Sequence, residues 1–109
     1  MDKGNLFIDA APPAQGERFN PLLAHKNLLI ERIVSSANSQ PVDYVQTQDE
    51  WVVLLQGEAV LQVAGESVSL TSGDHVFLPA GTPHKVERVS EGAMWLAVHL
   101  QNPDLTPTA

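Results

Sequence analysis

The chain is built from short apolar segments, each closed by a turn signal. Runs of four to seven residues rich in Val, Ile and Leu alternate with stretches that contain Gly, Pro, Ser or Asn, and no convincing helical pattern interrupts them. Such runs are typical of antiparallel strands joined by tight turns. The predicted fold is all-β, an antiparallel jelly-roll β-barrel (double-stranded β-helix), because closing the sheet removes exposed edges. We expect strands over residues 28–34, 42–46, 51–56, 58–63, 67–70, 75–78, 84–89 and 94–100.

The length of 109 residues leaves room for one domain with one core. We expect the barrel to span residues 28–100. Residues 1–27 are predicted to form an irregular N-terminal arm, in which Asn5–Ile8 could make a short edge strand and Glu17–His25 one or two helical turns. Residues 101–109 contain two prolines and no apolar periodicity, which predicts a flexible C-terminal tail.

The composition excludes several function classes. Thirteen acidic against six basic residues give a net charge of -7 without a Lys/Arg cluster, which argues against nucleic-acid and membrane partners. The absence of cysteine excludes disulfides, thiolate metal sites and a cysteine nucleophile. The apolar run at the N-terminus is too short for a signal peptide, and none approaches the roughly 18 apolar residues of a membrane span. We therefore expect a cytoplasmic protein.

Two stretches resemble the two halves of a small-molecule site. In the downstream stretch, a strand runs into a turn built from Pro79, which lacks an amide donor, and Gly81, which tolerates unusual backbone angles. That turn presents His84 at the start of the next strand. In the upstream stretch, Glu50 stands at the head of a strand that ends at Gly57. We interpret the two stretches as paired hairpin elements that share one pocket.

In this arrangement the chain resembles the cupins, a family of small β-barrels that includes dioxygenases, isomerases, decarboxylases and ligand-binding domains. The second cupin motif, glycine, five residues, Pro-x-Gly, two residues and histidine, is matched by Gly73, Pro79, Gly81 and His84. The first motif, His-x-His, three or four residues, glutamate, six residues and glycine, is matched at Glu50 and Gly57. The resemblance covers about residues 42 to 88, and the 15 residues between Gly57 and Gly73 are typical of compact microbial cupins.

The resemblance implies a metal site with an altered ligand set. Metal-binding cupins hold manganese, iron, nickel, zinc or copper through histidines and the glutamate, ligands that suit such ions. Here Tyr44 and Gln46 occupy the positions of the first two histidines, and Arg88 that of a trailing asparagine. The implied ligands to a divalent metal ion are therefore Gln46, Glu50 and His84. If the protein is an enzyme, the family implies oxidation, isomerisation or decarboxylation of a small polar metabolite.

The residues leave a metal-free alternative open. In that case the barrel is a non-catalytic ligand-binding or sensor domain without a cofactor, and Glu50 hydrogen-bonds to Gln46, Tyr44 or His84. A lone carboxylate facing an apolar interior is costly, so its pKa should rise or it should pair with His84 or Arg88. Either state of Glu50 could serve acid-base chemistry.

Three further residues are candidates for the ligand pocket. Tyr44 belongs to the motif region, and strand parity places Arg88 on the same face as His84, where it could clamp a carboxylate or phosphate. His99 is the weakest of the three. In the last strand Met94, Leu96, Val98 and Leu100 form the cleaner core face, which would leave His99 on the other side.

The run over residues 51–55 is apolar on both parities, which predicts a strand covered on both faces. The N-terminal segment or a second subunit could cover its outer face. Trp51 is expected on that outer face, and we predict a homodimer.

Overall fold

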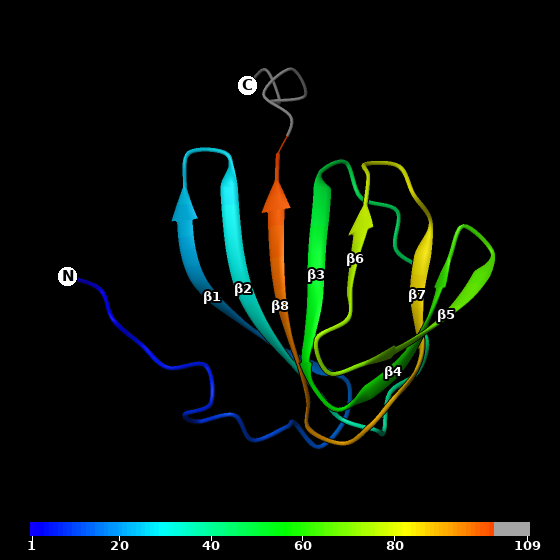
Figure 1. The fold of residues 1–109 in the computed structure, drawn as a ribbon, viewed down its shortest axis with the longest axis horizontal. Coiled ribbons are helices and arrows are strands. Elements are labelled where there is room, and N and C mark those ends of the chain that lie inside the picture. The colour runs from blue at the N-terminus through cyan, green and yellow to red at the C-terminus, as the bar shows by residue number, and fades with distance from the viewer. Residues whose placement is uncertain (102–109) are drawn as a thin grey trace.

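The computed structural model describes residues 1–101, which form eight antiparallel strands in two sheets. The five-stranded sheet has the order β1-β2-β8-β3-β6, and the three-stranded sheet the order β5-β4-β7 (Figure 1). The described residues contain no helix long and apolar enough to cross a membrane. The strands are β1 (Glu17–His25), β2 (Leu28–Ser35), β3 (Asp49–Gln56), β4 (Glu58–Val63), β5 (Glu66–Thr71), β6 (His75–Leu78), β7 (His84–Val89) and β8 (Ala93–Leu100).

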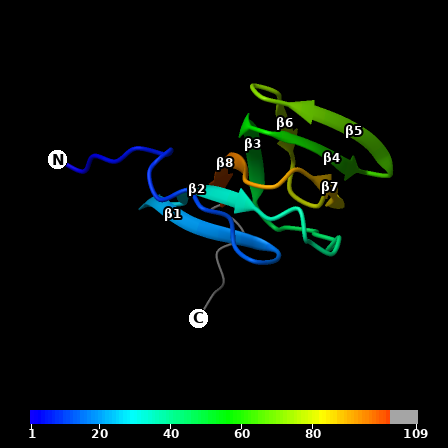
Figure 2. The same cartoon turned by 90° about the horizontal axis from the view of Figure 1, so that it is seen from below.

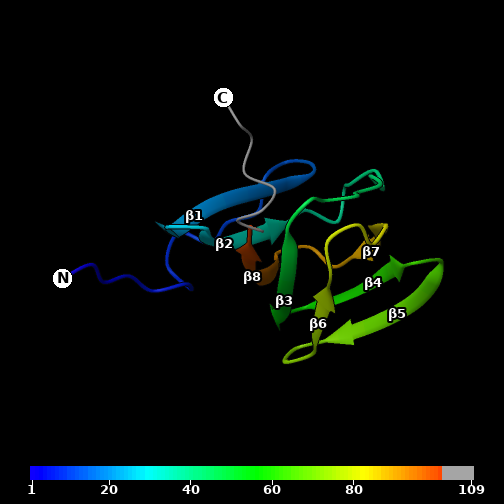
Figure 3. The same ribbon diagram turned by 90° about the horizontal axis from the view of Figure 1, so that it is seen from above.

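The two sheets face each other as the walls of a flattened barrel. Seen from below and from above, β1, β2 and β8 form one side, β4 and β5 the other, and the strands between them complete the wall (Figures 2 and 3). The predicted all-β jelly-roll barrel is therefore confirmed. The predicted tail lies outside the described residues, apart from Gln101.

Three local predictions are wrong. Residues Asn5–Ile8 form a turn closed by a hydrogen bond from the Ile8 amide to the Asn5 carbonyl, rather than a short edge strand. Residues Glu17–His25 form strand β1 rather than helical turns, because they pair along their whole length with β2. The expected strand over residues 42–46 is reduced to one isolated bridge at Tyr44. The N-terminal region is therefore part of the larger sheet, and only its first residues remain irregular.

The core lies between the sheets. Alternate side chains of β3 and β4 point inward, and large residues such as Leu54, Leu61 and Trp95 are almost completely buried. Burial of such side chains contributes roughly 1.5–3 kcal/mol each relative to exposure. Toward the end where β3 begins and β8 ends, the inward-facing residues become polar, with Glu50 opposite His99. The core thus closes one end of the barrel, and a pocket that polar and apolar side chains line occupies the other.

A continuous apolar row crosses the outer face of the five-stranded sheet. Trp51 pairs with Phe77 on one side and Val98 on the other, and the row continues through paired residues on β2 and β1. Phe77 is 57% exposed, Leu23 47% and Trp51 38%. Trp51 therefore lies on the outside of the Glu50 strand, as predicted. The outer row consists of Phe77, Trp51, Val98, Ile30 and Leu23.

Arg32 attaches the N-terminal segment to the same sheet. Its guanidinium donates hydrogen bonds to the carbonyl oxygens of Leu6 and Ile8 at 2.7 and 2.8 Å and to that of Asp9 at 3.0 Å. Asn20 on β1 accepts two more. The buried charge is thereby satisfied by five acceptor contacts, and the N-terminal segment covers the sheet beside the outer row rather than the row itself.

Gly57 forms the tight turn between β3 and β4. Its φ of 97° is strained for any residue with a side chain, and a Cβ there would lie 2.6 Å from Ser90 Oγ and 3.1 Å from Ala93 Cα. The Ser90 hydroxyl also accepts a hydrogen bond from the Glu58 amide at 2.9 Å. This close approach joins the β3–β4 turn to the β7–β8 turn.

We expect Gly57→Ala to lower the free energy of unfolding by about 2–4 kcal/mol, because backbone strain and steric conflict add. Gly73→Ala is the matched control, since Gly73 has a φ of 96° but no atom within 4 Å of the added Cβ. It should lose only the strain, about 1 kcal/mol. Urea denaturation of both variants measures the difference, and equal losses would contradict the proposed close packing.

Candidate functional site

Backbone hydrogen bonds hold the two motif stretches against each other. Tyr44 and His84 exchange both amide-to-carbonyl bonds, at 2.8 and 2.9 Å. The Gly81 amide donates to the Gln46 carbonyl at 2.8 Å, and the Ala80 amide to the Asp49 carboxylate at 2.8 Å. The Pro79–Gly81 turn is therefore fixed to the segment that precedes β3, which places His84 near Glu50.

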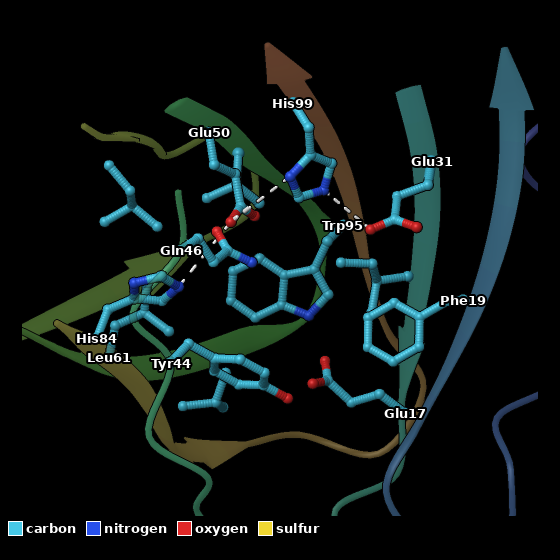
Figure 4. A pocket seen from close by; sticks show the side chains of 14 residues that line it. Glu17, Phe19, Glu31, Tyr44, Gln46, Glu50, Leu61, His84, Trp95 and His99 are labelled. Carbon is cyan, nitrogen blue, oxygen red and sulfur yellow. Dashed lines mark hydrogen bonds and ion pairs between the residues drawn. The ribbon is translucent and has the colours of Figure 1, made fainter. Parts of the chain in front are cut away.

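The site is a cavity of about 80 Å³ at the polar end of the barrel. Glu50 projects into it from β3, between its partners Leu78 on β6 and His99 on β8 (Figure 4). Glu50 and His99 are only 7% and 6% exposed. The lining residues are Glu17, Phe19, Glu31, Ile33, Tyr44, Gln46, Glu50, Val52, Leu61, Leu78, His84, Val86, Trp95 and His99.

Both histidines present an unprotonated nitrogen to Glu50 when they are neutral. His84 Nδ1 lies 3.0 Å from the Thr82 carbonyl oxygen, which can only accept, so Nδ1 carries the proton. His99 Nε2 donates to the Glu31 carboxylate at 2.9 Å. The remaining nitrogens, His84 Nε2 and His99 Nδ1, lie 3.9 and 4.0 Å from Glu50 Oε1. Both nitrogens therefore direct an electron pair toward Glu50, and the Gln48 side-chain amide, 3.4 Å from His99 Nδ1, can donate to that nitrogen.

The electrostatics of the pocket raise the pKa of the Glu50 carboxyl. Burial raises the pKa of the Glu50 carboxyl above its usual value of 4.5, while His99 and His84 oppose the rise and Glu31 adds to it. The Glu50 side chain has no hydrogen-bond partner among the described residues, so burial is poorly compensated. Such a carboxyl can take up or release a proton under conditions in which an exposed one is ionised.

A second acidic group lies across the cavity from Glu50. Glu17 Oε2 accepts a hydrogen bond from Ser35 Oγ at 3.1 Å, and Ser35 Oγ accepts one from Trp95 Nε1 at 3.1 Å. Burial raises the pKa of Glu17 despite the Ser35 bond, and Glu50 and Glu31 raise it further. Burial also raises the pKa of Tyr44, with smaller contributions from Glu17 and Glu50, so its phenol stays a proton donor. The Tyr44 ring stacks on His84 with centroids 5.7 Å apart.

The pocket contains the types of donor atom that bind a divalent metal ion. The distances between these donors are too long for a metal site. Two imidazole nitrogens and a carboxylate suit zinc or iron, whose bonds of about 2.1 Å set tetrahedral donors roughly 3.4 Å apart. The contacts from Glu50 to His84 and His99 are about half an ångström longer. Within residues 1–101, no three His, Asp or Glu side chains come close enough to hold one ion. A metal would require the three side chains to move inward.

The structure brings most of the predicted site residues together. Gln46, Glu50, His84 and Tyr44 all line the cavity. Arg88 does not. A β-bulge in β7 pairs Val86 with Leu61 but Arg88 with Val60, so the extra residue reverses the parity, and Arg88 is exposed on the outer side of the smaller sheet. The prediction that Arg88 faces the same way as His84 is therefore wrong.

The parity assigned to the last strand is also wrong. Trp95, Ala97 and His99 face the interior, because β8 lies between β2 and β3 and pairs His99 with Glu50. The apolar residues on the other parity belong to the outer face. Hydrophobicity alone could not distinguish the faces, since both are apolar over most of β8.

Sequence reasoning missed Glu17, Glu31, Phe19 and Trp95 as lining residues. Glu31 could have been found, because it is an acidic residue on the same strand parity as the apolar Leu29 and Ile33. Glu17 and Phe19 lay in a segment predicted to be irregular. Their place in the pocket depends on the pairing of β1 with β2, which brings β1 into the same sheet as β8 and β3.

The fold and the site together define a class: a small jelly-roll β-barrel with a pocket between its sheets that polar and apolar side chains line. Residues 30–99 match the family described as Cupin domain. The chain therefore belongs to the cupin family, and the predicted resemblance is confirmed. A comparison with curated proteins finds no match.

Solved structures of similar proteins agree with this assignment. A "putative mannose-6-phosphate isomerase" from Ralstonia eutropha JMP134 is 36% identical, with a TM-score of 0.84 over 94% of this chain and 100% of that one. The protein TT1209 from Thermus thermophilus is 26% identical, with a TM-score of 0.80 over the same shares. A conserved protein of unknown function from Streptococcus pyogenes, 21% identical with a TM-score of 0.76 over 99% and 90%, shares the fold.

We expect Glu50→Gln to raise the free energy of unfolding relative to the wild type at neutral pH. This advantage should be smaller in acid. A carboxyl whose pKa is raised by folding contributes stability below its unfolded pKa near 4.5, and that contribution is lost as the pH rises through the folded value. The advantage of the variant should grow from pH 4.5 upward by up to about 1.4 kcal/mol per unit of pKa shift. Urea denaturation across this range measures it.

Glu66→Gln, on an exposed position of β5, is the control and should leave the pH dependence unchanged. Parallel curves for wild type and Glu50→Gln would contradict a raised pKa at Glu50.

Proposed function

We propose that this cupin binds a small polar molecule in its barrel pocket and uses Glu50, between His84 and His99, to exchange a proton with it. The observation that carries this proposal is a buried carboxyl without a hydrogen-bond partner among the described residues, 3.9 and 4.0 Å from two imidazole nitrogens. A ligand hydroxyl placed in this gap could donate its proton to one of these acceptors, and an ammonium group could donate to more than one. The groups around it fix both histidine rings, as acid-base catalysis requires.

The name of the Ralstonia relative supports proton transfer as the reaction class, because an isomerase that converts one sugar into another moves a proton between carbon atoms. The phosphate in that name finds no counterpart here. Among the described residues that line the cavity there is no Lys or Arg, and three are carboxylic acids. We therefore propose an isomerase-like or binding function on a ligand that carries no phosphate or other anionic group. A binding domain would keep its ligand in Glu50→Gln, whereas a catalyst would lose turnover in the same variant.

A divalent metal ion is the second candidate, favoured by the two imidazole nitrogens that face the Glu50 carboxyl. Glu50, His84 and His99 would hold it, with Gln46 beside them in the cavity. His99 thereby supplies an imidazole where the motif lacks its first two histidines. Such an ion would polarise an oxygen of the bound ligand.

Analysis of untagged protein purified without chelator separates the candidates. We expect a small molecule to co-purify with the wild type and to be absent from the Glu50→Ala, His84→Ala double variant, as measured by native mass spectrometry and extraction. Elemental analysis of the same samples decides the metal. Near-stoichiometric metal that disappears in the variant supports the second candidate, and a barrel that holds neither metal nor molecule contradicts both.

We also propose that the outer row forms a homodimer interface. The row is apolar across all five strands. In a two-fold dimer the same surface of each subunit forms the interface, and an uncharged row can pack against its own copy without repulsion between like charges. Because each chain has a net charge of -7, two copies repel except where such an uncharged surface lets them approach.

We expect Trp51→Glu to convert a dimer into a monomer, because it places two charges at the centre of the apolar row. Val45→Glu, which replaces an apolar side chain that is 65% exposed in the loop before β3, is the matched control and should remain dimeric. Sedimentation velocity at micromolar concentration measures both. A monomeric wild type would contradict the proposed interface.

A further inference from the structure

The pocket lacks positive charge. Glu17, Glu31 and Glu50 face it from three different strands, and no cationic side chain other than the histidines is among its described lining residues. The carboxyls are close enough for Glu31 and Glu50 to raise the pKa of Glu17. A cavity with low-dielectric walls focuses such a field, which favours a cation and repels an anion.

The hydrogen-bonding groups of the pocket also require a donor from the ligand. The inner nitrogens of His84 and His99 are acceptors, because their other nitrogens already donate to Thr82 and Glu31. The Gln48 side-chain amide lies 3.4 Å from the inner nitrogen of His99, whereas that of His84 receives no hydrogen bond from the described residues. Glu50 is more than nine-tenths buried, points into the cavity and accepts no hydrogen bond from the described residues (Figure 4). Among the described lining side chains, the Tyr44 hydroxyl and the Gln46 amide are the ones left able to donate.

At Glu17 the acidic and aromatic residues form a defined subsite. One carboxylate oxygen is fixed by the Ser35 hydroxyl, which is in turn fixed by the Trp95 indole. Phe19, Tyr44 and Trp95 lie around the Glu17 carboxylate in the same cavity (Figure 4). Aromatic faces attract ammonium groups, and a carboxylate beside them accepts ammonium protons.

Glu17 stands at the junction of two cavities. Together with Phe19, Tyr44 and Val86 it lines both the barrel pocket of about 80 Å³ and an adjoining hollow of about 180 Å³ beside residues 39–42. A ligand bound at Glu17 could therefore extend toward Glu50 in one direction and toward the hollow in the other. The two spaces limit it to a small molecule.

We propose that the ligand is a small primary amine whose ammonium group binds Glu17 between Phe19, Tyr44 and Trp95. This assignment rests on the proposed binding function of the barrel and names the chemical class of its ligand. The ammonium supplies a positive charge that pairs with the carboxyls of the pocket. Its carbon chain lies along the apolar wall toward Glu50, where the proton-transfer groups are located.

An NMR titration of the 109-residue protein tests the proposal with two probes of similar size, propylammonium chloride and propan-1-ol. The chain has two tryptophans, and their indole N–H signals report on different places. Trp95 is hydrogen-bonded beside Glu17, whereas Trp51 lies on the outer face. We expect propylammonium to shift the Trp95 signal saturably, with an affinity at least about tenfold above that of propan-1-ol, and to leave Trp51 unchanged. Sodium chloride at equal ionic strength is the control.

Two variants localise the effect. Glu17→Gln keeps the shape of the side chain and should weaken propylammonium binding at least about tenfold, whereas Glu66→Gln should not. Phe19→Leu keeps an apolar side chain without a ring and should weaken binding severalfold. Well-dispersed spectra establish that each variant is folded, and the Phe19 variant provides the test if Glu17→Gln is not.

The two proposals can fail separately. Equal affinity for the two probes, or propylammonium binding unaffected by Glu17→Gln, overturns the amine assignment while the barrel remains a binding site. No response of Trp95 to either probe also overturns it, and co-purification then decides whether the pocket binds any molecule. An amine found in the co-purified fraction supports both.

Discussion

Burial of the Glu50 carboxyl inside the barrel is the constraint on which the site depends. A carboxyl that is 7% exposed and receives no hydrogen bond from the described residues is costly in its ionised form, and a proton, a metal ion, a ligand or water in the cavity offsets this cost. Its neighbours do not remove this cost, because both histidines direct their protons away from it. The apolar core that stabilises the fold thus leaves an unsatisfied polar group at one end, and the function proposed here uses that group.

The barrel positions this group through backbone pairing rather than through side chains. Strand β3 lies between β6 and β8, which fixes Glu50 opposite His99, while the bridge between Tyr44 and His84 brings in the second imidazole. These hydrogen bonds do not depend on the identity of the side chains at residues 44 and 46. The same frame can therefore hold Tyr and Gln where many cupins have histidines, and the chemistry of the pocket changes while the fold does not.

Sequence reasoning identified Glu50 and His84 because glycine and proline mark the turns around them. Turn residues have local physical requirements, and Gly57, with its positive φ and close contact to Ser90, is one example. The faces of β7 and β8 were assigned incorrectly. A single extra residue in β7 reverses the side on which Arg88 lies, and β8 is apolar on both faces, so neither orientation was determined by the local pattern.

By itself, the sequence determined the all-β fold, the two motif turns and the presence of a carboxyl and an imidazole near each other, because strand alternation and turn chemistry are local properties. Tertiary structure alone decided that β1 joins the sheet, that Glu17 and Glu31 face Glu50, and that His99 enters the pocket. These arrangements depend on which strands pair and in which register. That choice is made by the packing of the whole barrel, between residues separated by as many as 74 positions in the chain.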